Sequence, residues 1–558
     1  MAKGKRVLIV GGVAGGASCA ARGRRLSEDA EIIIFERGPY VSFANCGLPY
    51  YVGEVIKKEE NLLVATPELF KQRFNIEVHL RHEVLSIDRA NKRIEVHDLT
   101  SGDTHLEAYD ALVLSPGASP IKPPLPGIDC PGIFTVRTIP DSREIREWID
   151  RYQARRAVVV GGGFIGLEMT ENLVNRGLSV TIIEMQPQLM PLMDPEMITQ
   201  VHRHLRRNGV KLRLNETVIG FARNNGPLSL ELKSGDVEAA DLVVLSVGVR
   251  PETRLAKEAG LEIGARGGIK VDDRMRTSDP NIWAVGDAVE VRDVVTGQVG
   301  LTPLAGPANR QGRIAADVIC GRNSRFRGVQ GTAAVVAFGL AIASTGPTEK
   351  MLKQLGLWGD PGKYEKIYLH PGHHAGYYPG ASLITFKLIF AKEDGRIIGA
   401  QAVGNEGVDK RIDVIAMAIQ KNATVFDLEE AELSYCPQFG SAKDPINVAG
   451  MIAANVLRGD APIIHSDAVA ASDDFILDVR DRSEFANGHI DGAVNIPLNE
   501  LRGRVHELPR DRQILTYCFV GQRSYYANRM LSQRGFQVRN ISGGYRTYSM
   551  STSSGVDD

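Results

Sequence analysis

The sequence carries one local pattern twice, and this repeat narrows the possible folds more than any other feature. "KRVLIVGGVAGGASCAARGRRL" reads as a buried strand, a glycine turn and a helix of small residues, followed by a second apolar strand, "IIIFER", at residues 32–37. "RRAVVVGGGFIGLEMTENL" and "VTIIEM" repeat this order, with Gly161 lying 150 residues after Gly11. We therefore expect two α/β domains, each built around a parallel βαβ unit.

The glycines of each turn fit a Rossmann-like dinucleotide site. The first glycine of such a site permits the tight turn, the second lets the backbone approach the pyrophosphate, and the third lets the helix pack on the strand. The second copy has Gly161, Gly163 and Gly166, whereas the first has Gly11 and Gly16 with Val13 between them. The pyrophosphate would lie at the N-terminus of the helix, where backbone amides point outward.

Each copy also ends its second strand with an acidic residue. Glu36 lies 20 residues after Gly16, and Glu184 lies 18 residues after Gly166. A carboxylate at this place accepts a hydrogen bond from a ribose 2′-hydroxyl, and Glu184 would repel a 2′-phosphate, which favours NADH over NADPH. Two such sites predict FAD in one and NADH in the other. The alternative is a pair of glycine turns that bind nothing.

Length and composition limit the remaining possibilities. A chain of 558 residues predicts several domains, and its net charge of −1 does not indicate a nucleic-acid partner. The six scattered cysteines are too few for a disulfide scaffold, which favours a reducing compartment. The basic and apolar start superficially imitates a signal peptide, but glycines interrupt its apolar run. No apolar run is long enough to cross a membrane, so we expect a cytoplasmic protein.

A third segment identifies the superfamily. "TSDPNIWAVGDAVEV", residues 277–291, is a short strand ending in Gly-Asp. Together with the two glycine turns it resembles the FAD-dependent pyridine nucleotide-disulfide reductase superfamily over residues 1 to about 445. This resemblance implies FAD contacts at Gly11, Gly16, Glu36, Arg37 and Asp287, the last beside the ribityl chain. It implies NAD contacts at Gly161, Gly163, Gly166 and Glu184.

An isolated cysteine indicates the chemistry. In "YVSFANCGLPYYVG", Cys46 follows Asn45 and has no second cysteine at a spacing that would form a local disulfide. The stretch resembles the active site of coenzyme A-disulfide reductases, and "HHAGYYPGA" and "ELSYCPQFGSAKDPINVAGMIAAN" extend the resemblance. The resemblance implies a homodimer in which Tyr377 and Tyr435 reach the other subunit's cysteine, with Tyr378 competing for the first role.

The resemblance also points to a coenzyme A site and contains one departure. It assigns coenzyme A to Ser18, Arg22, Arg25 and Ser42, where two arginines on one helix face suit phosphates. The alternative is that these arginines are solvated surface charges. Where relatives read Tyr-Ala-Pro-Pro, this chain has Cys436 after the tyrosine and a glutamine at the end. We read Cys436 as a packed small residue.

The other histidines and cysteines are expected to be structural. His370, His373 and His374 stand close together in the sequence, but no carboxylate or thiol accompanies them, so we predict no metal site. We expect Cys19 to pack in the first helix. Cys130 falls in a loop and Cys320 ends a helix, and neither is expected to react.

The C-terminal part resembles the rhodanese family over about 90 residues. "DFILDVRDRSEFANGHIDGAVNIP" is followed by "ILTYCFVGQRS", an apolar strand that delivers Cys518 into a loop opening a helix. The family's six-residue active loop corresponds to Cys518–Arg523. In such a loop backbone amides, Arg523 and the helix N-terminus stabilise a thiolate or persulfide.

The expected architecture is therefore α/β, with two Rossmann-like domains, an α+β dimerisation domain and a rhodanese-like domain. The expected boundaries are 1–150 and 276–325 (FAD), 151–275 (NAD), 326–455 (dimerisation), 456–472 (linker), 473–550 (rhodanese) and 551–558 (tail). The attached rhodanese favours an NADH-dependent reductase of coenzyme A disulfide, coenzyme A persulfide or polysulfide. Two alternatives stay open: an NADH oxidase or peroxidase cycling Cys46 through sulfenic acid, and a redox or sulfur sensor.

Overall fold

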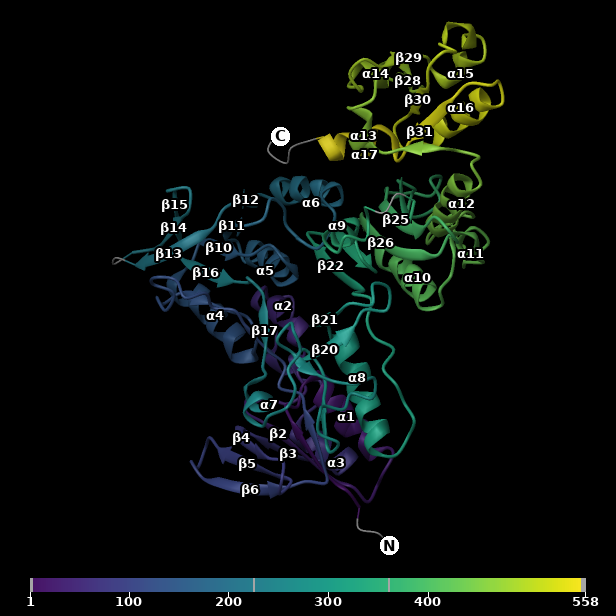
Figure 1. Cartoon of the computed structure of the whole chain (residues 1–558). Coiled ribbons are helices and arrows are strands. Elements are labelled where there is room, and N and C mark those ends of the chain that lie inside the picture. The colour runs from purple at the N-terminus through teal and green to yellow at the C-terminus, as the bar shows by residue number, and fades with distance from the viewer. Residues whose placement is uncertain (1–3, 224–225, 360–361, 553–558) are drawn as a thin grey trace. The chain divides into compact units, whose positions relative to one another are not determined.

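The first glycine turn lies at the end of β1 (Arg6–Val10), the central strand of a five-stranded parallel sheet with the order β19-β7-β1-β2-β3. Figure 1 labels two of these strands, β2 and β3. The other strands are β2 (Glu31–Glu36), β3 (Glu77–Leu80), β7 (Ala111–Leu114) and β19 (Ile282–Ala284). Helices α1 (Ala14–Arg24) and α8 (Ala305–Ile319) lie side by side. Leu8 and Ile9 are fully buried, as expected for a parallel sheet with both faces covered.

The second glycine turn follows β10 (Arg156–Val160) in another five-stranded parallel sheet, with the order β12-β11-β10-β16-β9. Its other strands are β9 (Ile133–Phe134), β11 (Ser179–Glu184), β12 (Lys211–Leu214) and β16 (Leu242–Leu245). Helix α5 (Phe164–Asn175) packs on β10 and β11. The two predicted βαβ units are both present, each with an apolar first strand.

Smaller elements surround these sheets. The helices are α2 (Leu48–Val52), α3 (Pro67–Phe74), α4 (Ile139–Tyr152) and α7 (Arg254–Glu258). Antiparallel strands are β4 (His82–Asp88), β5 (Arg93–Asp98) and β6 (Thr104–Ala108), then β13 (Val218–Arg223), β14 (Leu228–Leu232) and β15 (Val237–Ala240), and the pair β8 (Ala118–Pro120) and β17 (Val249–Pro251). A mixed sheet contains β18 (Ile269–Lys270), β20 (Val289–Arg292) and β21 (Val299–Leu301).

This computed structural model describes residues 4–223, 226–359 and 362–552. The chain divides into two units, residues 1–187 with 210–329 (unit 1) and residues 188–209 with 330–558 (unit 2). Both βαβ units belong to unit 1. Segment 188–209, which contains α6 (Pro195–Arg207), lies inside the expected NAD domain in sequence but packs within unit 2. Across the described ranges, no helix has the length and apolar character needed to cross a membrane.

Unit 2 contains an antiparallel sheet with the order β22-β23-β26-β25-β24. Its strands are β22 (Ala333–Ala337), β23 (Leu340–Thr345), β24 (Tyr364–Leu369), β25 (Thr385–Ala391) and β26 (Ile397–Gly404). The accompanying helices are α9 (Glu349–Gln354), α10 (Val408–Gln420), α11 (Val425–Glu429) and α12 (Pro445–Leu457). An antiparallel sheet with helices fits the expected α+β domain.

The last part of unit 2 has a parallel sheet with the order β27-β31-β30-β28-β29. Its strands are β27 (Ile463–Ile464), β28 (Phe475–Asp478), β29 (Val494–Asn495), β30 (Ile514–Tyr517) and β31 (Val538–Ile541). The helices are α13 (Ser466–Val469), α14 (Arg482–Ala486), α15 (Leu498–Leu501), α16 (Gln522–Ser532) and α17 (Gly544–Thr552). The segment 456–472, expected as a linker, therefore supplies an edge strand, because β27 pairs with β31.

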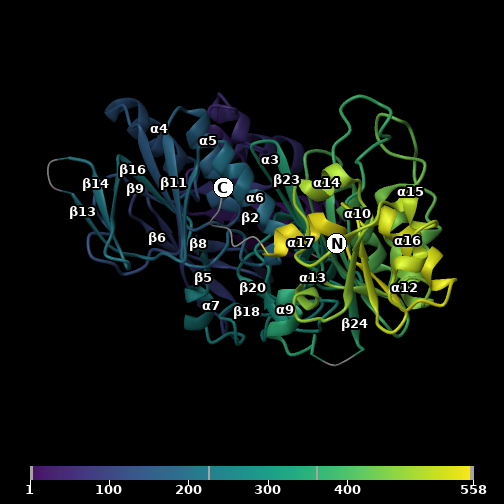
Figure 2. The ribbon, with the colours of Figure 1, turned by 90° about the horizontal axis from the view of Figure 1, so that it is seen from above.

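Helix α17 joins this C-terminal sheet to the rest of unit 2. Figure 2 shows α17 beside α13, with which it is in contact. The Oγ1 of Thr547 lies 2.8 Å from Nε2 of His370, and the hydroxyl of Thr199 on α6 donates to the carbonyl of Met550 at 2.9 Å. The amide of Tyr368 donates to the hydroxyl of Ser542 at 3.0 Å. Buried hydrogen bonds therefore fix the C-terminal domain to its neighbour.

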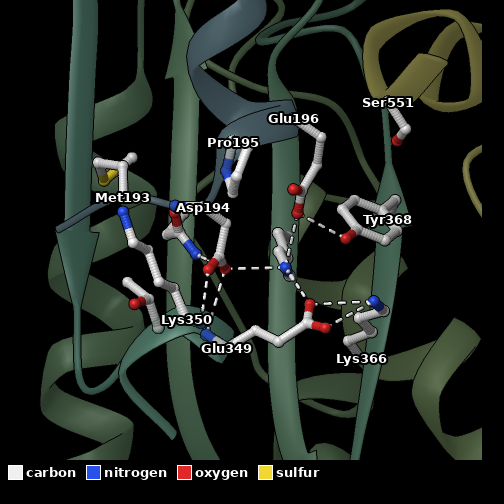
Figure 3. Close-up of polar contacts among 12 residues, drawn as sticks. Met193, Asp194, Pro195, Glu196, Glu349, Lys350, Lys366, Tyr368 and Ser551 are labelled. Atoms are coloured by element: carbon white, nitrogen blue, oxygen red, sulfur yellow. Dashed lines mark hydrogen bonds and ion pairs between the residues drawn. The ribbon is translucent and has the colours of Figure 1, made fainter. Parts of the chain in front are cut away.

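A buried lysine organises the interior of unit 2. The ammonium of Lys387 on β25 lies 2.8 Å from Asp194, 2.6 Å from Glu196 and 2.7 Å from Glu349. Figure 3 labels these three acids. Burial raises the pKa of Glu349, but the charges of Lys387 and Lys366 outweigh it and hold that pKa below its ordinary value. By spacing, the three carboxylates are suited to a metal ion, but the ammonium of Lys387 already contacts all three of them.

Candidate active site

The predicted nucleophile lies on a tight turn. Cys46 is exposed within a single 3₁₀ turn, Asn45–Gly47, directly before α2. The preceding segment is tied to the first glycine turn, because the amide of Ser42 donates to the carbonyl of Gly12 at 2.9 Å. A Cβ on Gly47 would lie 2.7 Å from Cδ2 of Leu62, so a larger residue here would require that buried side chain to shift. The thiol is therefore accessible on backbone that is fixed next to a predicted dinucleotide site.

Two residues that contribute to the Cys46 site, Glu168 and Tyr50, were not anticipated from the sequence. Burial first, and then the charge of Glu168 on α5, raise the pKa of the Cys46 thiol. Burial also raises the pKa of Glu168 to about 7, while a hydrogen bond from Tyr50, at 3.4 Å, acts in the opposite direction. The sequence marks Glu168 only as a single acid within the apolar stretch "FIGLEM". With a pKa of about 7 and a charge that acts on the thiol, Glu168 is a candidate for proton transfer at this site.

The first turn positions are held by backbone geometry that requires glycine. Gly11 has a φ of +91°, and a Cβ on it would lie 2.1 Å from the carbonyl oxygen of Ser115. Gly161 has a φ of +103°, and a Cβ on it would lie 2.5 Å from the carbonyl oxygen of Ser246. At both turns the backbone can therefore pass from strand to helix only because these positions lack a side chain.

The remaining turn glycines have two different roles: some allow close packing, and one leaves room for a ligand. A Cβ on Gly16 or Gly166 would strike the carbonyl of Gly11 or Gly161, at 1.9 Å and 2.1 Å. At Gly163, in contrast, a Cβ would have no atom of the described residues within 4 Å apart from its immediate neighbours along the chain. The middle glycine of the second turn thus faces open space, the arrangement expected where a pyrophosphate approaches the backbone. The residues present therefore fit a bound dinucleotide.

The two strand-end acids occupy equivalent places. A carboxylate oxygen of Glu36 accepts from the amide of Gly12 at 2.9 Å, and one of Glu184 accepts from the amide of Gly162 at 2.8 Å. Each acid thus lies against its own glycine turn, which is the position expected of a carboxylate that binds the ribose of a dinucleotide. Arg37 is exposed and lies 3.8 Å from Glu252.

Asp287 follows the first sheet directly, after β19. Burial raises the pKa of its carboxyl group, and the charge of Arg137, 3.9 Å away, lowers it. Its charge also raises the pKa of the Cys46 thiol, so the structure brings Asp287 and Cys46 to the same region of unit 1.

Three of the predicted coenzyme A residues, Ser18, Arg22 and Arg25, lie on α1 or at its end. Ser18 bonds to Asn309, and Nε of Arg22 lies 2.7 Å from Asp317, both on α8. Arg25 is exposed at the end of α1. Arg22 is therefore already paired, whereas Arg25 presents its charge to solvent.

In unit 2 the structure brings the two predicted tyrosines together. The hydroxyls of Tyr377 and Tyr435 lie 2.6 Å apart, although their side chains are 76% and 49% exposed. Tyr378 instead accepts from Gln438 at 3.0 Å. The hydrogen bond to Tyr377 raises the pKa of Tyr435. Tyr377 therefore pairs with Tyr435, whereas Tyr378 pairs with Gln438, the glutamine that departs from the family pattern.

The histidine cluster is used for structure. His370 is buried between Thr385, at 3.3 Å, and Thr547. His373 contacts Ser382 and lies 3.2 Å from Glu406, and His374 faces the carbonyl of Ala375.

Four cysteines lie outside the two predicted centres. All six cysteines are free thiols. Cys19 is buried, which raises its pKa to about 12, and Cys130, Cys320 and Cys436 are partly buried. Burial first also raises the pKa of Cys320. A raised pKa leaves little thiolate at neutral pH, so Cys19 and Cys320 are poor nucleophiles.

The C-terminal domain presents a second sulfur site. Cys518 is buried directly after β30, and the amide of Gly521 donates to its Sγ at 3.2 Å. Arg523 points instead to Glu484 on α14, with two contacts of 2.7 Å. The amides of Tyr545 and Arg546, at the start of α17, hold the carbonyls of Cys518 and Phe519.

Comparison with known proteins identifies the domains. The pyridine nucleotide-disulphide oxidoreductase family matches residues 5–312, its dimerisation domain residues 332–443, and the rhodanese-like domain residues 464–551. A coenzyme A disulfide reductase of Staphylococcus haemolyticus is 35% identical over 80% of this chain and 98% of its own.

Two solved structures cover almost the whole chain. Reduced Bacillus anthracis CoADR-RHD is 47% identical, covers 98% of both chains and has a TM-score of 0.95. A NAD-dependent persulfide reductase from A. fulgidus is 38% identical, covers 97% of this chain and 100% of its own, and has a TM-score of 0.90. These matches confirm the predicted fold class. The chain therefore belongs to the pyridine nucleotide-disulphide oxidoreductase family, with that family's dimerisation domain and a C-terminal rhodanese-like domain.

Proposed function

We propose that this oxidoreductase uses NADH to reduce coenzyme A disulfide, coenzyme A persulfide or polysulfide through Cys46, while Cys518 handles sulfane sulfur. The observation that carries the proposal is an accessible single thiol fixed beside the first glycine turn, in a chain that has a second sulfur site in its rhodanese-like domain. The names of the relatives, a coenzyme A disulfide reductase and a persulfide reductase, support this substrate class.

The glycine turns and their acids would hold the cofactors. Gly11, Gly16, Glu36, Arg37 and Asp287 would bind FAD, and Gly161, Gly163, Gly166 and Glu184 would bind NADH. FAD supplies the transfer of electrons from NADH to a disulfide. The carboxylates of Glu36 and Glu184 lie where each would orient a ribose, and they favour a 2′-hydroxyl over a 2′-phosphate.

Cys46 would form a mixed disulfide with the substrate. Its thiolate attacks the coenzyme A sulfur of a persulfide, a sulfur–sulfur bond breaks, and hydrosulfide leaves. Two electrons and a proton then return the Cys46 thiolate and release the coenzyme A thiol. With a disulfide substrate the leaving group is a second coenzyme A thiolate. Glu168, whose pKa is about 7, is suited to protonate the departing sulfur.

The tyrosine pair would stabilise the leaving thiolate. Both hydroxyls are exposed and adjacent, and the one that accepts the hydrogen bond between them keeps its own proton free to donate to an incoming ligand. The match to the dimerisation domain supports a homodimer, in which this pair would serve Cys46 of the second subunit. Ser18, Arg22, Arg25 and Ser42 remain candidates for coenzyme A, with Arg25 the one whose charge faces solvent.

The test is anaerobic NADH consumption driven by coenzyme A persulfide and, separately, by coenzyme A disulfide. Cys46→Ser should abolish both, and Cys130→Ser, at a partly buried cysteine outside the site, should change neither. An unchanged rate in Cys46→Ser refutes the proposal. Turnover with oxygen that exceeds turnover with either substrate supports the oxidase alternative, and negligible turnover with all three supports the sensor.

A further inference from the structure

The two tyrosines that meet in unit 2 lie on separate loops. Residues 370–381 and 432–440, here called the two tyrosine loops, carry Tyr377 and Tyr435. One backbone bond links them directly, from the amide of Ala375 to the carbonyl of Gly440 at 2.9 Å. Because Tyr377 is mostly exposed and Tyr435 is about half exposed, their own packing holds them weakly, and the loop backbone must set the distance between their hydroxyls.

One arginine behind the loops contacts both of them. Arg411 lies on α10 and its side chain is 1% exposed. Its Nη2 donates to the carbonyl of His373 on the first loop at 2.8 Å and to that of Phe439 on the second at 3.4 Å. A single guanidinium thus bridges the backbone on either side of the tyrosine pair.

A carboxylate fixes this guanidinium from the other side. Nη2 of Arg411 lies 2.7 Å from Asp444, which stands before α12 and also accepts from the amide of Ile446 at 3.0 Å. Nη1 donates to the carbonyl of Gly407 at 3.2 Å. The planar head is therefore held at several points, which a guanidinium allows and a lysine ammonium on a flexible stem does not.

We propose that Arg411 is a positioning residue that sets the spacing of the Tyr377 and Tyr435 hydroxyls by holding the two tyrosine loops together. Its importance for turnover rests on the function proposed above for the tyrosine pair. Its importance for the geometry of the pair does not, and can be measured without any reaction.

The geometric test is a fluorine NMR titration of the dimeric holoenzyme carrying 3-fluorotyrosine at position 435. Tyr377→Phe should lower the pKa of the labelled phenol, because the hydrogen bond between the two hydroxyls raises it. Arg411→Lys should move the titration in the same direction. The control is Arg458→Lys, which alters an exposed arginine paired with Glu429 by two contacts of 3.0 Å and 2.7 Å, and it should leave the titration unchanged.

Either of two results overturns the inference. One is a titration that Arg411→Lys leaves where it was, and the other is a titration that Tyr377→Phe does not move, because the hydroxyls are then not paired. If Arg411→Lys fails to fold, the double variant Arg411→Gln/Asp444→Asn removes both buried charges together and replaces it. That variant should shift the titration as Tyr377→Phe does.

Turnover separates this inference from the proposed function. Arg411→Lys should lower kcat for coenzyme A disulfide about tenfold and leave the KM for NADH unchanged. In the wild-type background, Tyr377→Phe and Tyr435→Phe should be non-additive, and in the Arg411→Lys background they should become additive. If neither tyrosine affects turnover while Arg411→Lys still moves the fluorine titration, the proposed role of the tyrosines fails and the positioning role stands.

Discussion

The ammonium of Lys387 lies 2.7 Å from a carboxylate oxygen of Glu349, and the two side chains are 0% and 6% exposed. Lys387 is surrounded by two further carboxylates, so its removal would leave buried negative charge without a partner. Lys387→Met should lower the free energy of unfolding by about 3–5 kcal/mol. Urea unfolding measures this change.

The control for that variant uses the same carboxylate. Lys353 also contacts Glu349, at 2.6 Å, but its side chain is 54% exposed. Lys353→Met should cost less than about 1 kcal/mol, because exposed ion pairs contribute little. Equal losses in the two variants would show that burial does not determine the strength of the cluster.

Glu168→Gln should make the Cys46 thiol more reactive. The Glu168 charge raises the pKa of the thiol, after burial, and its removal should therefore increase the thiolate fraction. Alkylation of the reduced enzyme by iodoacetamide, followed at Cys46 by peptide mass spectrometry, should be about threefold faster at pH 8. Below pH 7 the two rates should converge, because Glu168, with a pKa of about 7, is then protonated in the wild type. Glu60→Gln, at an exposed acid in the same unit, should match the wild type; a slower reaction in Glu168→Gln would contradict the assignment.

His370 should make unit 2 less stable in acid. Burial first, and then the charge of Arg546, lower its pKa to about 3, whereas an unfolded histidine takes up a proton below about pH 6.5. Between these values only the unfolded chain is protonated, so stability falls as the pH drops. From this group, urea unfolding should show a loss of about 2 kcal/mol between pH 7 and pH 5. His370→Gln should remove that part of the acid sensitivity, and His489→Gln, at an exposed histidine, should retain it.

Arg523 should act on Cys518 through the shape of the loop. Its guanidinium makes two contacts of 2.7 Å with Glu484. Arg523 lies two residues after Gly521, whose amide donates to the Cys518 sulfur. Arg523→Lys keeps the charge and loses the bidentate pair, so sulfane sulfur on Cys518 should fall roughly fivefold. Cyanide treatment and thiocyanate assay measure that sulfur. Arg529→Lys, on the same helix and paired with Asp460, is the control; full loading of Arg523→Lys would mean that the pair does not shape the loop.

Local patterns were sufficient to predict the two dinucleotide turns. The role of Gly166 depends on the carbonyl of Gly161, five residues earlier, and the acids at Glu36 and Glu184 follow at a fixed distance along one βαβ unit, although the close contact of Gly161 with Ser246 is distant in sequence. Cys46 and Cys518 were also recognised from short stretches, because each stands on a turn whose neighbours are close in sequence.

Contacts distant in sequence were not predictable in this way. Lys387 lies in the apolar strand "TFKLIFA", and nothing local shows that its partners come from segments near residues 194 and 349. Arg411 belongs to an ordinary amphipathic helix, and its role appears only when two loops fold over it. Segment 188–209 reads as part of the NAD domain because its sequence neighbours are there, yet its packing partners lie in unit 2.

The way α17 is held has a practical consequence for anyone dividing this protein. The helix supports the Cys518 loop at its start and bonds to α6 and to His370 further along. Cutting the chain near residue 456 to isolate a reductase would uncover Thr199, Tyr368 and His370 with their hydrogen bonds unmade. Because the groups at those three positions are polar, water can replace the lost partners, so a shortened version should tolerate the cut at those positions.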